Sequence, residues 1–276
     1  MTNRSPATPP RRLHAPGRGS GPRIVLVHGF TQSAASWEPV ARALAGSHEV
    51  VTPDLPGHGR SPAAAGDLES AATELATSCG RATYVGYSLG GRVCLQLALD
   101  HPEVVERLVL VSTTAGIEDL DERAERAARD EELARRIEEG GDRNVPAFLD
   151  EWLAGPLFAH LSDEAAGRPA RLVNTAAGLA SSLRAHGTGA MLPLWERLGE
   201  LGMPVVVVAG AEDAKFAALA RRLAAATRRS SLALVPGAGH AVPFEQPEAF
   251  ARLVAEVVAG APPPASEPDG GPGIPA

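Results

Sequence analysis

A serine with a glycine two residues away on each side is the part of this chain best suited to nucleophilic chemistry. It lies in Gly86-Tyr87-Ser88-Leu89-Gly90, between an apolar run at 82–85 and a helical pattern at 92–99. A nucleophile elbow requires a strand, a sharp turn and a helix, and small residues relieve crowding where the backbone reverses. The motif predicts that Ser88 is a catalytic nucleophile. The alternative is a glycine-rich turn that carries an incidental serine.

Two later segments could supply the base and the acid that such a serine needs. Each follows an apolar run that predicts a strand: Asp213 after 205–208, and His240 after 232–235. Because the carboxyl ends of parallel strands share one edge of a sheet, we expect these side chains to meet Ser88 there. Asp213 would orient His240, and His240 would take the serine proton. Glu212 is the alternative acid, since it is adjacent and equally ionisable.

A third strand end, at His28-Gly29-Phe30, resembles the oxyanion-hole loop of α/β hydrolases. The backbone N–H groups of Phe30 and Leu89 would then hold developing negative charge, and His28 would be structural. No histidine spacing indicates a metal site, and the chemistry implies no cofactor. The histidines without supporting neighbours are expected to be solvated or locally hydrogen-bonded: His14, His48, His101, His160 and His186.

Composition limits the function classes. The chain has 276 residues, is 44% hydrophobic and carries a formal charge of −7, which suits one sizeable domain with an insertion and argues against nucleic acid as a partner. Two cysteines, Cys79 and Cys94, fit a reducing, cytoplasmic location better than a disulfide scaffold. No apolar stretch approaches the roughly 18 residues of a membrane span.

Strand and helix patterns alternate through most of the chain and predict a mostly parallel, doubly wound α/β sheet. We expect strands at 24–28, 48–54, 82–87, 106–112, 204–209 and 230–235. The alternation stops after Thr113, and a helical cap is expected above the carboxyl edge of the sheet. The expected organisation is a flexible leader at 1–21, a core at 22–114 and 202–259, a cap at 115–201 and a disordered tail at 260–276.

Longer motifs give a more specific resemblance. The elbow extends through Gly91-Arg92, the glycine loop through Thr31-Gln32-Ser33, and the acid segment reads Asp213-Ala214-Lys215-Phe216. With these motifs, residues from about 13 to 258 resemble the 2-succinyl-6-hydroxy-2,4-cyclohexadiene-1-carboxylate synthases of menaquinone synthesis, which are lyases with an α/β-hydrolase fold. Lys215 is the sole lysine among 26 basic residues. Its place directly after the acid favours a retained role.

The resemblance implies elimination of pyruvate from a small enolpyruvyl cyclohexene dicarboxylate, with the triad serine as a base. Such an anionic substrate needs cationic groups. Arg92 lies one helical turn beyond Ser88, and its guanidinium could bind a substrate carboxylate. The alternative is that Arg92 is an ordinary arginine on the surface of the helix. By resemblance, Tyr87, Arg126, Trp152 and Arg171 also bind substrate. For the cap arginines, helical register leaves four alternatives: Arg123, Arg129, Arg168 and Arg184.

Two departures from the family pattern concern the acid loop and the end of the cap. The glutamate after Gly210 is shifted by one position, and residues 187–193 lack a glutamine before Pro193.

Rival functions use the same scaffold. A carboxylesterase or C–C bond hydrolase would keep Ser88 and its partners but need a site for attacking water, and a non-catalytic binding protein would need no triad.

Overall fold

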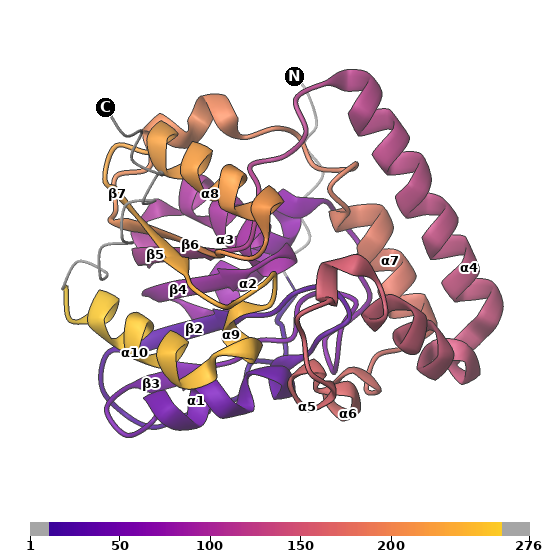
Figure 1. The fold of residues 1–276 in the computed structure, drawn as a ribbon, viewed down its shortest axis with the longest axis horizontal. Coiled ribbons are helices and arrows are strands. Elements are labelled where there is room, and N and C mark those ends of the chain that lie inside the picture. Colours follow the sequence, from indigo (N-terminus) through magenta and orange to yellow (C-terminus); the bar gives the residue numbers. More distant parts are fainter. Residues whose placement is uncertain (1–10, 261–276) are drawn as a thin grey trace, which may run out of the picture.

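The computed structural model describes residues 11–260, in which seven strands form one sheet of order β1-β3-β2-β4-β5-β6-β7 (Figure 1). Every neighbouring pair is parallel except β1 with β3. The strands are β1 Gly17–Arg18, β2 Arg23–Val27, β3 Glu49–Val51, β4 Ala82–Tyr87, β5 Val105–Val111, β6 Val205–Gly210 and β7 Ser230–Val235. The predicted α/β fold with a mostly parallel sheet is confirmed.

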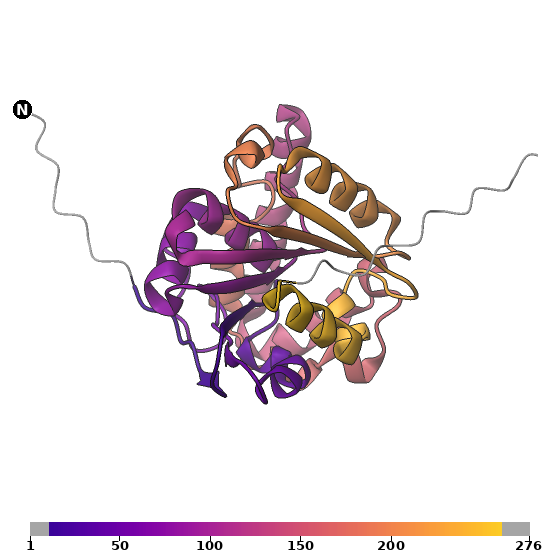
Figure 2. The ribbon, with the colours of Figure 1, turned by 90° about the vertical axis from the view of Figure 1, so that its left-hand side faces the viewer.

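Helices cover both faces of the sheet, as the near-continuous apolar strands require. One face carries α1 (Glu38–Leu44) and α10 (Pro247–Val258). The other carries α2 (Leu68–Cys79), α3 (Leu89–Asp100) and α8 (Ala214–Ala226). Figure 2 shows α8 and α10 on opposite sides of the twisted sheet. The short helix α9 (Val242–Glu245) precedes α10.

The expected helical segment between β5 and β6 contains α4 (Leu120–Leu153), α5 (Asp163–Ala166), α6 (Arg168–Arg171) and α7 (Ala176–His186). We call residues 115–201 the cap. Its helices lie together beside the sheet in Figure 1, and α4 packs against α7 through an apolar cluster that includes Leu149 and Leu179. The long helix α4 changes direction at Gly141, where φ is 61°. Short 3-10 turns occur at Ala34–Trp37, Pro102–Val104, Pro156–Phe158 and Trp195–Glu200.

The described part of the predicted flexible leader is ordered, so that prediction is wrong for residues 11–21. Gly17 and Arg18 pair with β3, the Leu13 side chain is buried, and its amide donates to Ser78 Oγ. Burial of Leu13 and the added strand offset the entropy of fixing this segment. Residues 1–10 and, apart from Gly260, the predicted tail at 260–276 lie outside the described residues.

Strand boundaries differ from expectation by a few residues, most at β3, which ends at Val51 instead of residue 54. Pro53 has no N–H to donate to a neighbouring strand, so the ladder ends before it. No helix within residues 11–260 is long and apolar enough to cross a membrane.

Candidate active site

The turn after β4 holds Ser88 in a strained conformation. Ser88 has φ 52° and ψ −109°, a region that non-glycine residues rarely adopt. A Cβ on Gly86 would lie 2.4 Å from the Gly90 carbonyl oxygen, and one on Gly90 would lie 2.2 Å from that of Val27. Glycine is therefore required at both positions. The turn places the Ser88 side chain at the N-terminus of α3, at the carboxyl edge of the sheet.

Ser88, His240 and Asp213 form one hydrogen-bonded chain across three strand ends. His240 Nδ1 lies 3.0 Å from Asp213 Oδ2, and His240 Nε2 lies 3.4 Å from Ser88 Oγ. Glu212, the alternative acid, is exposed and is not the residue that contacts His240. The geometry is that of a nucleophile or base, a proton acceptor and an orienting acid.

Asp213 is held by a second bond that fixes its orientation. As the N-cap of α8, it accepts from the amide of Phe216 at 3.1 Å through Oδ1 while Oδ2 faces the imidazole. Burial raises the pKa of this carboxyl, but the hydrogen bonds from His240 and Phe216 outweigh burial and lower the pKa overall. The carboxylate is therefore ionised throughout the neutral range, as an orienting acid requires.

Aromatic rings surround the imidazole of His240, which is 2% exposed. The ring of Phe216 lies 4.4 Å from it, that of Tyr87 5.4 Å and that of Phe158 6.3 Å, measured between centroids. Burial raises the pKa of the Tyr87 phenol, which stays protonated. This enclosure restricts the imidazole to the plane in which it faces both partners.

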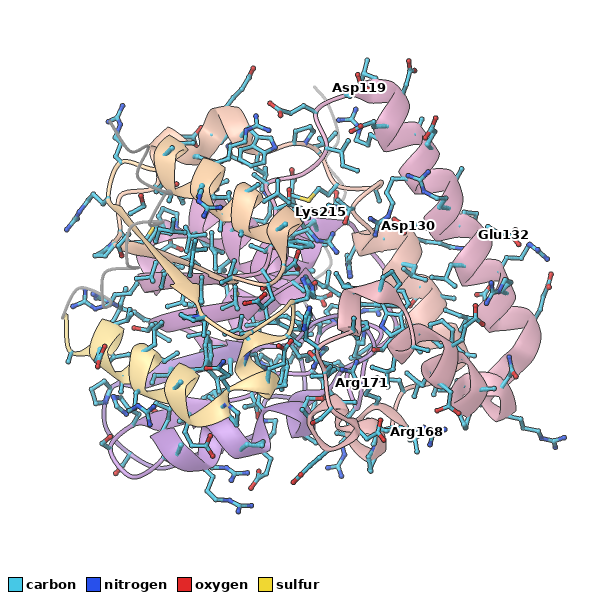
Figure 3. The ribbon with its side chains drawn as sticks, viewed as in Figure 1. Asp119, Asp130, Glu132, Arg168, Arg171 and Lys215 are labelled. Atoms are coloured by element: carbon cyan, nitrogen blue, oxygen red, sulfur yellow. The ribbon has the colours of Figure 1, made fainter. Side chains whose placement is uncertain are left out.

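A cavity of about 420 Å³ opens between the core and the cap beside this chain. The two residues predicted for the oxyanion hole, Phe30 and Leu89, line it together with Ser88 and His240. Leu89 is the first residue of α3, so its amide has no partner inside the helix. In Figure 3, Lys215 from α8 and Asp130 from α4 lie on either side of the junction between core and cap, and both line the cavity.

Arg92 lies in this cavity and is buried, so its surface-helix alternative is wrong. Its Nη1 donates to the carbonyl oxygen of His186, and within residues 11–260 it makes no ion pair with a carboxylate. Burial, with repulsion from Arg126, lowers the pKa of Arg92 to about 10, while Asp130 opposes the shift. The guanidinium is still charged at neutral pH and has no direct carboxylate partner within residues 11–260.

Arg171 is a second buried arginine near Ser88. It lines a second, smaller cavity with Tyr87, Ser88 and His240. The Arg171 side chain is 2% exposed, and burial lowers its pKa to about 10. It donates to the carbonyl of Ala166 at 2.8 Å and to Thr31 Oγ1, both neutral acceptors. A second buried positive charge therefore lies beside the Ser88–His240 pair.

The structure shows which cap arginines line the cavities beside Ser88, a question that helical register in the sequence left open. Arg126 lines the main cavity and donates through Nε to Asp130 at 2.8 Å, and Arg129 also lines it. Arg168 pairs with Asp150 and Arg184 with Glu131, and neither lines either cavity beside Ser88. Arg123 does not line them either.

The indole of Trp152 lines both cavities, and its Nε1 has no hydrogen-bond partner in the described chain. It packs edge-on against Phe30, 5.3 Å between ring centroids. This contact ties the cap to the loop after β2. Trp152 thus both packs against neighbouring rings and lines the two cavities.

The lining residues that were not predicted include three with unpaired polar atoms: Ser112, Ser182 and His186. Each is buried and has a side-chain polar atom without a partner in the described chain. Ser112 ends β5 with φ 46°. The expectation that His186 is solvated or locally hydrogen-bonded is wrong, because its ring is buried and bonds the backbone of Gly66, far earlier in the chain. The serine and histidine four residues apart in α7 were the available signal.

The chain is similar in sequence to a protein family and to two proteins named as synthases. A family model described as "Alpha/beta hydrolase family" matches residues 24–253. A Salmonella schwarzengrund 2-succinyl-6-hydroxy-2,4-cyclohexadiene-1-carboxylate synthase is 30% identical over 89% of this chain and 97% of its own length. A Bacillus subtilis protein described as a candidate for the same synthase is 35% identical over 87% and 91%.

The chain is also similar to proteins of known structure. MenH from S. aureus aligns with a TM-score of 0.82 and 27% identity over 90% of this chain and 98% of its own. A thermophilic esterase from Thermogutta terrifontis aligns with a TM-score of 0.78 and 24% identity over 90% and 93%, a likeness that extends to the fold alone.

Proposed function

The chain belongs to the alpha/beta hydrolase family, and we propose that within it this protein is a lyase that eliminates pyruvate from 2-succinyl-5-enolpyruvyl-6-hydroxy-3-cyclohexene-1-carboxylate. The product is 2-succinyl-6-hydroxy-2,4-cyclohexadiene-1-carboxylate, an intermediate of menaquinone biosynthesis. The synthase relatives match over nearly the whole chain and support this reaction. A cytoplasmic location also belongs to the proposal, because Cys79 and Cys94 are free and buried, which suits a reducing compartment.

The observation that carries the proposal is a pair of buried arginines without carboxylate partners in the described chain, each of which lines a cavity that Ser88 also lines. Arg92 reaches the main cavity from α3, and Arg171 reaches the smaller one from the cap. A buried charge is costly unless it is paired, so a polyanionic ligand that pairs with both is strongly favoured. The proposed substrate carries a carboxylate on its ring, one on its succinyl arm and one on its enolpyruvyl arm.

The bond changes define what the triad must do. The ring double bond at C3 becomes a diene at C2 and C4, so a proton leaves C2 and the enolpyruvyl oxygen leaves C5. Ser88 takes the C2 proton while His240 accepts the serine proton, and Asp213 stabilises the imidazolium that results. The electrons of the C2–H bond delocalise into the succinyl carbonyl, then form the diene as the C5–O bond breaks. The departing enolpyruvate takes the proton of the imidazolium and becomes pyruvate, which restores the triad.

The same geometry suits stabilisation of the charge that develops on the succinyl carbonyl oxygen. The amides of Phe30 and Leu89 would donate to this oxygen, and the α3 N-terminus adds favourable potential. The buried arginines would hold the carboxylates, so that the C2–H bond faces Ser88. No covalent acyl-enzyme is needed, and a hydrolytic water has no role in the cycle.

The test is pyruvate release from the enolpyruvyl substrate beside hydrolysis of a short aryl ester by the same preparation. Rapid pyruvate release with negligible ester cleavage supports the lyase, and the opposite result supports the carboxylesterase alternative. Ser88→Ala should lower pyruvate release by several orders of magnitude, with residual rate from substrate positioning. Wild-type release by that variant would refute the role of Ser88.

A further inference from the structure

Two polar side chains on one face of α7 lack hydrogen-bond partners although both are buried. Ser182 and His186 are each 1% exposed, and both line the main cavity. Ser182 Oγ and His186 Nδ1 have no partner in the described chain. They are four residues apart, so they lie one above the other on the helix. Leaving such atoms unpaired is unfavourable, and a ligand that pairs with both relieves the penalty.

The neighbouring Ser181 is hydrogen-bonded, so an unpaired hydroxyl is not a general property of the serines in α7. Ser181 Oγ donates to the carbonyl of Gly178 at 2.7 Å and accepts from the amide of Ala64 at 3.1 Å. It lies outside the lining of the main cavity. A helical serine commonly bonds back to its own helix in this way. Ser182, one residue later, makes no such bond and belongs to the lining of the main cavity.

The imidazole of His186, which lines the cavity, has one nitrogen, Nδ1, without a partner in the described chain. Burial, with the nearby Arg92 charge, lowers its pKa to about 4, so the ring is neutral at physiological pH. The backbone of Gly66 and Asp67 opposes this shift by accepting from the ring, so Nδ1, which has no partner in the described chain, is assigned as the unprotonated nitrogen. Nδ1 is then left with a lone pair, which only a ligand with an O–H or N–H group can satisfy. A carboxylate, which has no donor, cannot satisfy it.

The adjacent guanidinium defines the second half of the ligand. Arg92 Nη1 donates to the carbonyl of His186, so the Arg92 charge and the two unpaired atoms belong to one wall of the cavity. Guanidinium suits a carboxylate, and the hydroxyl and imidazole suit an uncharged hydroxyl. Together they match a hydroxyl on the carbon adjacent to the one that bears a carboxylate.

We propose that Ser182 and His186 form a subsite that binds the 6-hydroxyl of the substrate while Arg92 binds the carboxylate on the neighbouring carbon C1. This assignment rests on the proposed function for the identity of the substrate. The hydroxyl donates to His186 Nδ1 and accepts from Ser182 Oγ, which satisfies both buried atoms. The subsite selects a cyclic β-hydroxy acid over the same ring acid without the hydroxyl.

The test uses two small ligands that differ only in this group: trans- or cis-2-hydroxycyclohexane-1-carboxylate, and cyclohexane-1-carboxylate. Their dissociation constants are measured by calorimetry, and their inhibition of pyruvate release is measured in parallel. The wild-type protein should bind one hydroxy isomer at least about tenfold more tightly than the plain acid, since two buried partners would otherwise remain unpaired. A Ser182→Ala, His186→Leu double variant should bind both ligands equally.

Matched variants separate recognition from folding. Ser181→Ala, on the same helix but outside the cavity lining, should keep the wild-type preference. Ser182→Ala should melt no lower than the wild type, because it removes a buried hydroxyl that bonds nothing in the described chain. With the enolpyruvyl substrate, the double variant should raise KM about tenfold or more, with kcat changed less.

Equal binding of the two ligands by the wild-type protein would refute the subsite, as would a hydroxyl preference that survives in the double variant. The binding measurement does not depend on turnover. A hydroxyl preference without pyruvate release would therefore overturn the proposed lyase function while keeping the subsite, and pyruvate release without a preference would do the reverse.

Discussion

Replacement of Arg92 by methionine should change stability and catalysis in opposite directions. Methionine keeps much of the volume of the side chain but removes a charge that the free protein leaves without a carboxylate partner in the described chain. Under the proposed function, this charge serves substrate binding and does not stabilise the fold. Loss of the charge should therefore make the folded chain more stable and the enzyme much slower.

The expected gain in stability follows from the pKa of Arg92, which falls from 12.5 to about 10. At 1.36 kcal/mol for each pKa unit, the buried charge costs roughly 3 kcal/mol. The unfolded chain binds more protons only between about pH 10 and 12.5, so the cost is fully present at neutral pH. Loss of the hydrogen bond from Arg92 to the His186 carbonyl offsets roughly 1 kcal/mol of this gain in stability. A gain of about 2 kcal/mol raises the melting temperature by roughly 4–8 °C.

The loss of catalysis should be larger. Truncating one partner of a buried, hydrogen-bonded charge pair costs about 2–5 kcal/mol, which lowers kcat/KM roughly 30-fold to several thousand-fold. Pyruvate release and thermal unfolding at pH 7.5 measure the two effects. Arg197→Met, which removes an arginine paired with Asp100 and Glu200 away from the cavity, is the control and should leave kcat/KM unchanged. A melting temperature that falls together with activity would show a structural role and refute the reasoning.

Three further predictions concern the acid, the buried histidine and the lysine. Asp213→Asn should lower kcat by several orders of magnitude, whereas Glu212→Gln, an exposed neighbour, should retain it; equal effects would contradict the assignment of the acid. Because the pKa of His186 is lowered to about 4, the unfolded state binds more protons below about pH 6.5, and stability falls as pH falls. In urea titrations, His186→Leu should therefore lose roughly 2 kcal/mol less than the wild type between pH 7.5 and 5, and identical losses would exclude this linkage. Lys215→Gln should raise KM several-fold at low salt and little at high salt, since an exposed cation attracts an anion through a screened field, and a salt-independent effect would indicate direct contact.

Local patterns were sufficient for the fold and for the residues of the triad. The elbow could be identified because its chemistry is local: a strand, a strained serine and glycines that a Cβ would displace. The order of apolar runs then placed Asp213 and His240 at the same sheet edge as Ser88. The ordered strand at Gly17–Arg18 could not be identified, because two residues carry no periodicity and their pairing with β3 is a tertiary contact.

The cap shows where sequence reasoning stops. Its composition predicted helices, but it did not show which arginines face the substrate, because several occur within one or two turns of each other. The packing of α4 on α7 turns Arg126 and Asp130 toward the cavity and leaves Arg184 outside, paired with Glu131. The same packing buries His186, for which the sequence indicated a solvated or local role.

The sequence by itself therefore determined the α/β fold and the identity of the catalytic candidates. The order of the strands and the residue types of the turns can be identified from short contiguous segments. Only the tertiary structure decided which charges are buried without an ion pair and which polar atoms of α7 have no partner in the described chain. Burial and hydrogen-bond satisfaction depend on what the rest of the chain places around a side chain, and those neighbours come from segments far away in the sequence.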